Sequence, residues 1–109
     1  AGTPVPKGIN YRMHPGNIPV LAAAGINCCI LANNHVLDWG EAGLRETLRT
    51  LDNAGLARAG AGANSREAAA PAVLPSAAGG RILVFGLGLP TSGIPSSWAA
   101  SGAAAGKTP

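Results

Sequence analysis

The clearest hydrophobic pattern in the chain is a leucine stripe between residues 41 and 54. Its members recur at i, i+4 and i+7, which places them on one face of a helix, and they are Leu44, Leu48 and Leu51. Charges of opposite sign at i+3 or i+4 predict ion pairs on the other face, and these are Glu41–Arg45 and Glu46–Arg49. We therefore expect a helix over residues 41–54, ended by Gly55.

A nearly continuous apolar run, residues 26–32, precedes this helix. Such a run is typical of a parallel strand that is buried on both faces. Before it, Asn17 is a favourable N-cap and Pro19 suits a first turn, so we expect a short helix that Gly25 ends. A second short strand is expected over residues 56–59, because Ala54-Gly55-Leu56 repeats the helix-to-strand turn pattern of Ala24-Gly25-Ile26.

The second half of the chain predicts one or two helical turns at residues 64–70 and a hairpin of strands at 72–74 and 81–87. Helices that alternate with strands indicate an α/β fold, and the late hairpin indicates a mixed sheet. Residues 90–109 are expected to be an unfinished loop, in which Ile94 and Trp98 would pack on a part of the protein outside this chain. We therefore expect the chain to be an internal piece of a longer protein.

Composition limits the size of the core. Alanine accounts for 22 of the 109 residues, and Leu, Ile, Val and Phe together make about a fifth of the chain, so one domain with a small core is expected. No apolar run reaches the roughly 18 residues of a membrane-spanning helix, and no secretory signal is visible. The net charge of +3 is scattered and aromatic residues are only 4%, which argues against nucleic-acid binding.

Candidate chemistry is concentrated where the apolar strand ends and the leucine-striped helix begins. Four polar residues lie within six positions: Asn33, Asn34, His35 and Asp38. Loops at the carboxyl ends of strands are where open α/β sheets bind ligands. An Asn amide oxygen can ligate a hard metal ion and a neighbouring His can transfer a proton, so the Asn34–His35 pair favours a function. For Asp38, helix capping and catalysis are equally supported.

Other residues allow both a functional and a structural interpretation. His14, before a proline, is more typical of a solvent-facing turn than of a site. Arg12 could bind an anionic group or pack its stem on Tyr11. The adjacent Cys28–Cys29 point to opposite strand faces and are expected to be reduced core residues. Trp39 is expected to fill the core.

The segment from Leu31 to Gly40, with its Asn-Asn-His and Asp-x-Gly elements, resembles the signature of bacterial CapA-type capsule and poly-γ-glutamate synthesis proteins. Those proteins belong to the calcineurin-like metallophosphoesterase superfamily. The resemblance extends from about residue 7 to residue 98. Its other parts are Lys7 with Asn10-Tyr11-Arg12, Gly43-Leu44, Thr47-Leu48, Leu51, Ala54-Gly55-Leu56, Gly60-Ala61-Gly62, Glu67-Ala68 and Pro71.

The resemblance implies a mixed β-sandwich flanked by helices in α-β-β-α layers, of which residues 1–109 would form a part. It also implies that Asn34 is a metal ligand and that His35 is the catalytic residue, as a proton donor or a transition-state stabiliser. Asn33, Asp38 and Arg12 would be supporting or substrate-binding residues. A divalent metal pair of the Mn²⁺, Fe or Zn²⁺ class is implied for the parent protein. One Asn cannot hold two ions, so this chain alone is expected to be inactive.

Two functions follow from the resemblance. The first is a metal-dependent hydrolase in capsule or poly-γ-glutamate metabolism, acting on an anionic polymer or a phosphoester. The second is a non-catalytic assembly or scaffold subunit of a polymer synthesis and export complex. Membrane-associated capsule machinery and the rest of the parent chain would be the partners. The family is often membrane-anchored or at the cell surface, which leaves the location of this protein open.

Overall fold

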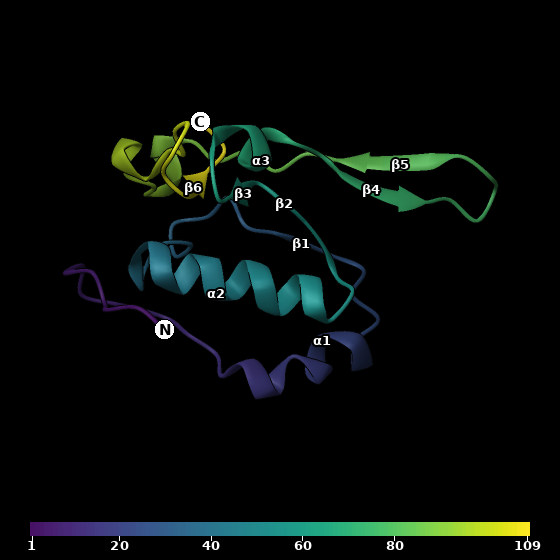
Figure 1. Cartoon of the computed structure of the whole chain (residues 1–109), viewed down its shortest axis with the longest axis horizontal. Helices are drawn as coiled ribbons and strands as arrows, with labels where there is room; N and C mark the ends of the chain where they lie inside the picture. Colours follow the sequence, from purple (N-terminus) through teal and green to yellow (C-terminus); the bar gives the residue numbers. More distant parts are fainter.

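The computed structural model describes residues 1–109 as short helices and strands around one longer helix (Figure 1). Its helices are α1 (Pro19–Ala23), α2 (Gly40–Asn53) and α3 (Ser65–Ala69). Its strands are β1 (Cys28–Ile30), β2 (Ala57–Ala59), β3 (Ala61–Gly62), β4 (Ala72–Pro75), β5 (Arg81–Val84) and β6 (Gly106–Lys107). Turns of 3₁₀ helix cover Pro15–Asn17, Pro90–Ser92 and Ser96–Trp98. The predicted α/β class is confirmed.

The strands form three separate two-stranded sheets rather than the one mixed sheet that the sequence predicted. β1 pairs with β2 in parallel, whereas β3–β6 and β4–β5 are antiparallel pairs. The parallel pairing of β1 and the hairpin of β4 and β5 are confirmed. The predicted full burial of β1 is wrong, because Cys28 and Cys29 are half-buried and Ile30 is 46% exposed. Both cysteines are free thiols.

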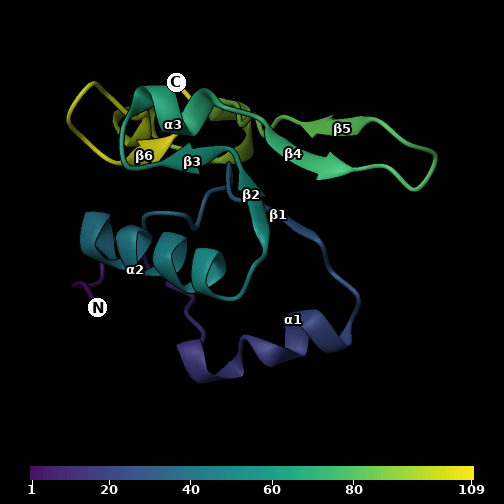
Figure 2. The same ribbon diagram turned by 45° about the vertical axis from the view of Figure 1, so that its right-hand side comes forward.

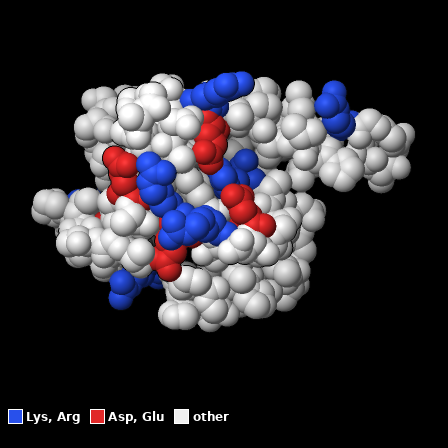
Figure 3. All heavy atoms as spheres, viewed as in Figure 1, with Lys and Arg blue, Asp and Glu red and all other residues white.

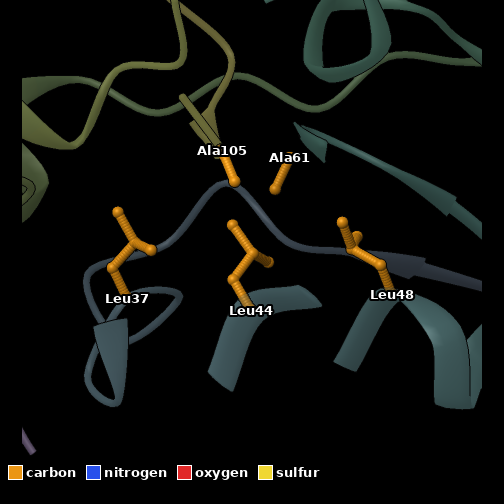
Figure 4. Close-up of a cluster of buried hydrophobic side chains, with 5 residues drawn as sticks. All are labelled: Leu37, Leu44, Leu48, Ala61 and Ala105. Atoms are coloured by element: carbon orange, nitrogen blue, oxygen red, sulfur yellow. The ribbon is translucent and has the colours of Figure 1, made fainter. Parts of the chain in front are cut away.

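Helix α2 supplies the core, as its leucine stripe predicted. Leu44, Leu48 and Leu51 are all buried. The first two pack with Leu37, Ala61 and Ala105, so that α2 lies against the segments around β3 and β6 (Figure 4). Both ribbon views place α2 alongside β1 and β2 (Figures 1 and 2). The core therefore fixes the start of α2, where the candidate site lies.

Charged side chains of both signs intermingle on one face of the molecule (Figure 3). The predicted pair of Glu41 and Arg45 forms at 3.6 Å. Glu46 contacts the amino group of Ala1 instead of Arg49, so that predicted pair is not observed. No helix is both long enough and apolar enough to cross a membrane.

The start of the chain differs in one respect from the prediction. Asn17 is not an N-cap, because the prolines at 15 and 19 divide the segment into a 3₁₀ turn that ends at Asn17 and a helix that follows it. The residue before α1 is Ile18, which makes no side-chain capping bond. Gly25 does end the helical segment, with the positive φ of 74° that favours glycine.

The segment from 90 to 109 folds onto the rest of this chain. It contains two 3₁₀ turns and strand β6, and Ile94 is 2% exposed. The Thr108 hydroxyl lies 2.8 Å from the carbonyl oxygens of both Ala68 and Gly86. Residues 90–109 are therefore more ordered than the unfinished loop that the sequence suggested.

Candidate functional site

The candidate site is the turn-rich loop that connects β1 to α2. Within it, the Asn33 side-chain oxygen accepts a hydrogen bond of 2.9 Å from the backbone N–H of His35. This side-chain-to-backbone bond two residues along is the local geometry that Asn favours in turns. Asn33 therefore shapes the loop that carries His35.

Asp38 is the central buried group of the site, with 1% of its surface exposed. Its Oδ1 accepts a hydrogen bond of 2.6 Å from Lys7 Nζ. Its Oδ2 lies 2.7 Å from His35 Nδ1 and accepts a bond of 2.8 Å from the Tyr11 backbone N–H. Helix α2 begins at Gly40 after Trp39, without a side-chain cap. The capping interpretation of Asp38 is therefore wrong.

These contacts set the charge on Asp38. Burial raises the pKa of this carboxyl, but hydrogen bonds from Lys7, the Tyr11 amide and His35 outweigh burial and lower the pKa below its usual range. An ionised carboxylate only accepts hydrogen bonds, so it assigns the proton of a neutral His35 to Nδ1. The Nε2 atom of His35, which has no partner in the protein, is then left with a free lone pair.

Lys7 is a residue of the candidate site that the sequence pattern did not single out. Its ammonium group binds Asp38, donates to the backbone oxygen of Asn34 and lies 5.1 Å from the centre of the Trp98 ring. A buried carboxylate requires a partner of opposite charge, which is a signal that one of the eight basic residues contacts it. The partner is 31 positions away in the sequence, so the pattern could not identify it.

Asn34 is half-buried next to His35, and its side-chain amide makes no hydrogen bond with the protein. A Cβ atom placed on Gly93 would lie 3.6 Å from Asn34 Nδ2, so the segment after β5 covers one side of this amide. No group of three or more His, Cys, Asp or Glu residues is arranged to hold a metal ion. Asp38 accepts hydrogen bonds from Lys7 and the Tyr11 amide and contacts His35. Beside it, the Asn34 amide oxygen and the Nε2 atom of His35 are candidate ligand atoms without a partner in the protein.

A cleft of about 910 Å³ opens beside His35, between residues 11–21, β1 and α2. The Tyr11 ring packs against the His35 ring, with centroids 4.4 Å apart and planes inclined by 59°. His14 also lines the cleft, and its Nδ1 accepts a bond of 2.9 Å from the Gly16 N–H. This local bond supports the turn interpretation of His14.

Arg12 and Trp39 form the wall of the cleft next to Tyr11. The Arg12 guanidinium lies 4.3 Å from the centre of the Trp39 ring, so it packs on Trp39. Trp39 Nε1 donates a bond of 3.0 Å to the Tyr11 carbonyl oxygen. Trp39 is only half-buried, so its assignment to the core is corrected: its ring faces Arg12 at the surface of the cleft.

Comparison with known proteins places this site in a family context. Residues 1–109 match the family described as "Bacterial capsule synthesis protein PGA_cap". A "probable polyglutamine synthesis accessory protein" of Mycobacterium tuberculosis is 43% identical over 94 residues, which are 86% of this chain and 25% of that protein. An uncharacterised protein of Sinorhizobium fredii is 48% identical over 61 residues, which are 56% of this chain and 13% of that protein. The chain thus spans about a quarter of the mycobacterial relative, and by its match over all 109 residues it belongs to the bacterial capsule synthesis family PGA_cap.

Proposed function

We propose that the protein carries a metal-dependent hydrolase site that acts in capsule or polyglutamate synthesis, and that His35 is the proton-transfer residue of this site. The observation that carries the proposal is the contact of 2.7 Å between His35 Nδ1 and the buried Asp38 carboxylate, beside an open cleft. The substrate is an anionic polymer or a phosphoester. Membership of the capsule synthesis family supports a role in capsule or polyglutamate synthesis. The contact between His35 and Asp38 supports proton transfer by His35.

The proton transfer follows from the contacts around His35. With Nδ1 held by Asp38, Nε2 takes a proton from an attacking water or, when protonated, gives one to a leaving group. The Asp38 carboxylate stabilises the imidazolium that forms, and the adjacent Lys7 keeps Asp38 ionised. Asn33 holds the backbone N–H of His35, which fixes the position of the ring in the loop.

Asn34 is the metal ligand in this proposal. Its amide oxygen has no partner in the protein and can supply one ligand, whereas the chain holds no cluster that completes a metal pair. The other ligands would come from parts of the full-length protein outside this chain. A bound divalent ion of the Mn²⁺, Fe or Zn²⁺ class would neutralise negative charge on the oxygens of the substrate.

The apolar side chains of the β4–β5 hairpin support the metallophosphoesterase-like sandwich proposed for the complete domain. Val73 pairs with Leu83 and Leu74 pairs with Ile82, so successive pairs put apolar side chains on opposite faces of the hairpin. Strands that are apolar on both faces are typical of a sheet buried between two layers. The hairpin extends away from the helices in both ribbon views (Figures 1 and 2).

A pair of substitutions in the full-length protein tests this function. The Asn34→Ala variant should bind Mn²⁺ more weakly in calorimetry, while Asn27→Ala, an exposed amide at the other end of β1, should bind it normally. The His35→Asn variant should bind Mn²⁺ normally but hydrolyse p-nitrophenyl phosphate or a short glutamate polymer about 10²- to 10⁴-fold more slowly. His14→Asn, from the same cleft, is its matched control and should retain wild-type turnover.

Two results would contradict the assignments separately. Equal Mn²⁺ affinity in wild type and Asn34→Ala would refute the ligand assignment. Full turnover in His35→Asn, or no turnover in wild type on either substrate, would favour the second candidate function, a non-catalytic assembly subunit. The word "accessory" in the description of the mycobacterial relative is the observation that favours this second function.

A further inference from the structure

Arg12 is a cation without an anionic partner at the edge of the cleft. Its side chain makes no ion pair and no hydrogen bond with the protein. Lys7, Arg45 and Arg58 pair with carboxylates, and of the unpaired arginines only Arg12 lines the cleft. A guanidinium presents five N–H donors in a planar fork that matches a carboxylate or a phosphate. The donors of Arg12 are therefore free for a ligand.

Neighbouring residues hold the Arg12 guanidinium in position. The Trp39 ring covers one face of Arg12 at 4.3 Å, and such stacking reduces the conformational freedom that the side chain would lose on binding. Trp39 is held in turn by its bond to the Tyr11 carbonyl oxygen. The Tyr11 amide donates to Asp38, so hydrogen bonds connect the Arg12–Trp39 stack to His35.

Arg12 is the only arginine in the lining of the cleft, which contains no lysine. Glu46 is the one carboxylate of the lining, and it makes no ion pair with Arg12. The Arg12 guanidinium therefore keeps its charge for an incoming oxyanion.

The geometry points to Arg12, stacked on Trp39, as the residue that binds a substrate oxyanion, either a carboxylate or a phosphate. The oxyanion bound there places the rest of the ligand in the cleft next to His35. This inference rests on the proposed function, because it assigns the substrate-anchoring residue of the same site. The stack on the Trp39 ring is the structural feature that orients Arg12.

Binding of small oxyanions to the full-length protein tests the inference directly. The probes are inorganic phosphate and glutarate, a dicarboxylate, each measured by calorimetry. The Arg12→Gln variant lacks the guanidinium and should bind at least one probe about tenfold or more weakly, because charge-assisted hydrogen bonds are lost. Arg45→Gln, on the outer face of α2, is the matched control and should bind both probes as the wild type does.

The two probes separate the two sources of the oxyanion. Stronger Arg12-dependent binding of phosphate assigns a phosphoester substrate, and stronger Arg12-dependent binding of glutarate assigns a carboxylate polymer. Equal affinities of wild type and Arg12→Gln for both probes would overturn the inference. This experiment measures no turnover. Weakened binding in Arg12→Gln therefore supports anion binding by Arg12 even if His35→Asn retains full activity and the proposed hydrolase function fails.

Discussion

Asp38 shows how a single buried residue organises this site. An ionised carboxylate out of contact with water is costly unless charged and hydrogen-bonding groups satisfy it. Asp38 has three such partners: Lys7 and Tyr11, which lie far away in the sequence before α1, and His35 within the same loop. The carboxylate thereby ties the start of the chain to the candidate catalytic loop.

The lowered pKa of Asp38 predicts an acid-dependent contribution to stability. A carboxyl whose pKa is lower in the folded than in the unfolded state stabilises the fold above its unfolded pKa of about 4. This contribution is lost as the pH falls through the lower folded-state pKa. Asp38→Asn should therefore be less stable than the wild type at pH 7 in urea denaturation, and the difference should shrink below about pH 4.

The control for this measurement is Asp52→Asn. The Arg58 side chain holds the pKa of Asp52 low despite partial burial, but the Asp52 side chain is 54% exposed, so solvent screens the pair and its effect should be smaller. A stability difference between wild type and Asp38→Asn that stays the same from pH 7 to pH 3 would contradict the assigned charge state.

Among the helices and strands, features that depend on local sequence patterns were predicted well. Features that depend on distant partners were not. The leucine stripe predicted α2 and its buried face, because helical spacing depends only on residues a few positions apart. Asn64 also caps α3, where its side chain accepts a bond of 2.9 Å from the Glu67 N–H. The prediction that β1 is fully buried was wrong, because burial depends on covering layers that the strand does not have in this chain. Sheet membership likewise depends on strands far apart in sequence.

The core role of α2 predicts a large difference between two leucines. Leu44 is 1% exposed in the central cluster, whereas Leu87 is 74% exposed after β5. Leu44→Ala should lower the free energy of unfolding by about 2–5 kcal/mol, since it leaves a cavity. Leu87→Ala should change it by about 0.5 kcal/mol or less. Similar losses in both variants would show that α2 does not supply the core.

At the scale of the whole molecule, the site is assembled from three regions. The loop after β1 carries Asn34 and His35, which were recognisable because they are adjacent and follow an apolar strand. Lys7 arrives from the first residues and Trp98 from the segment 90–109, and no local pattern predicted that these would meet. The sequence thus indicated where the chemistry lies, whereas the folded chain shows which charges surround it.

In the proposed function, Asp38 fixes His35 with its proton on Nδ1 and leaves the lone pair of Nε2 free for proton transfer. The most direct test is long-range ¹⁵N–¹H correlation NMR of the full-length protein labelled at histidine nitrogen, at a pH where His35 is neutral. We expect a protonated Nδ1 and an unprotonated Nε2 in the wild type, and loss of this preference in Asp38→Asn. A proton on Nε2 of His35 in the wild type would contradict this proton assignment.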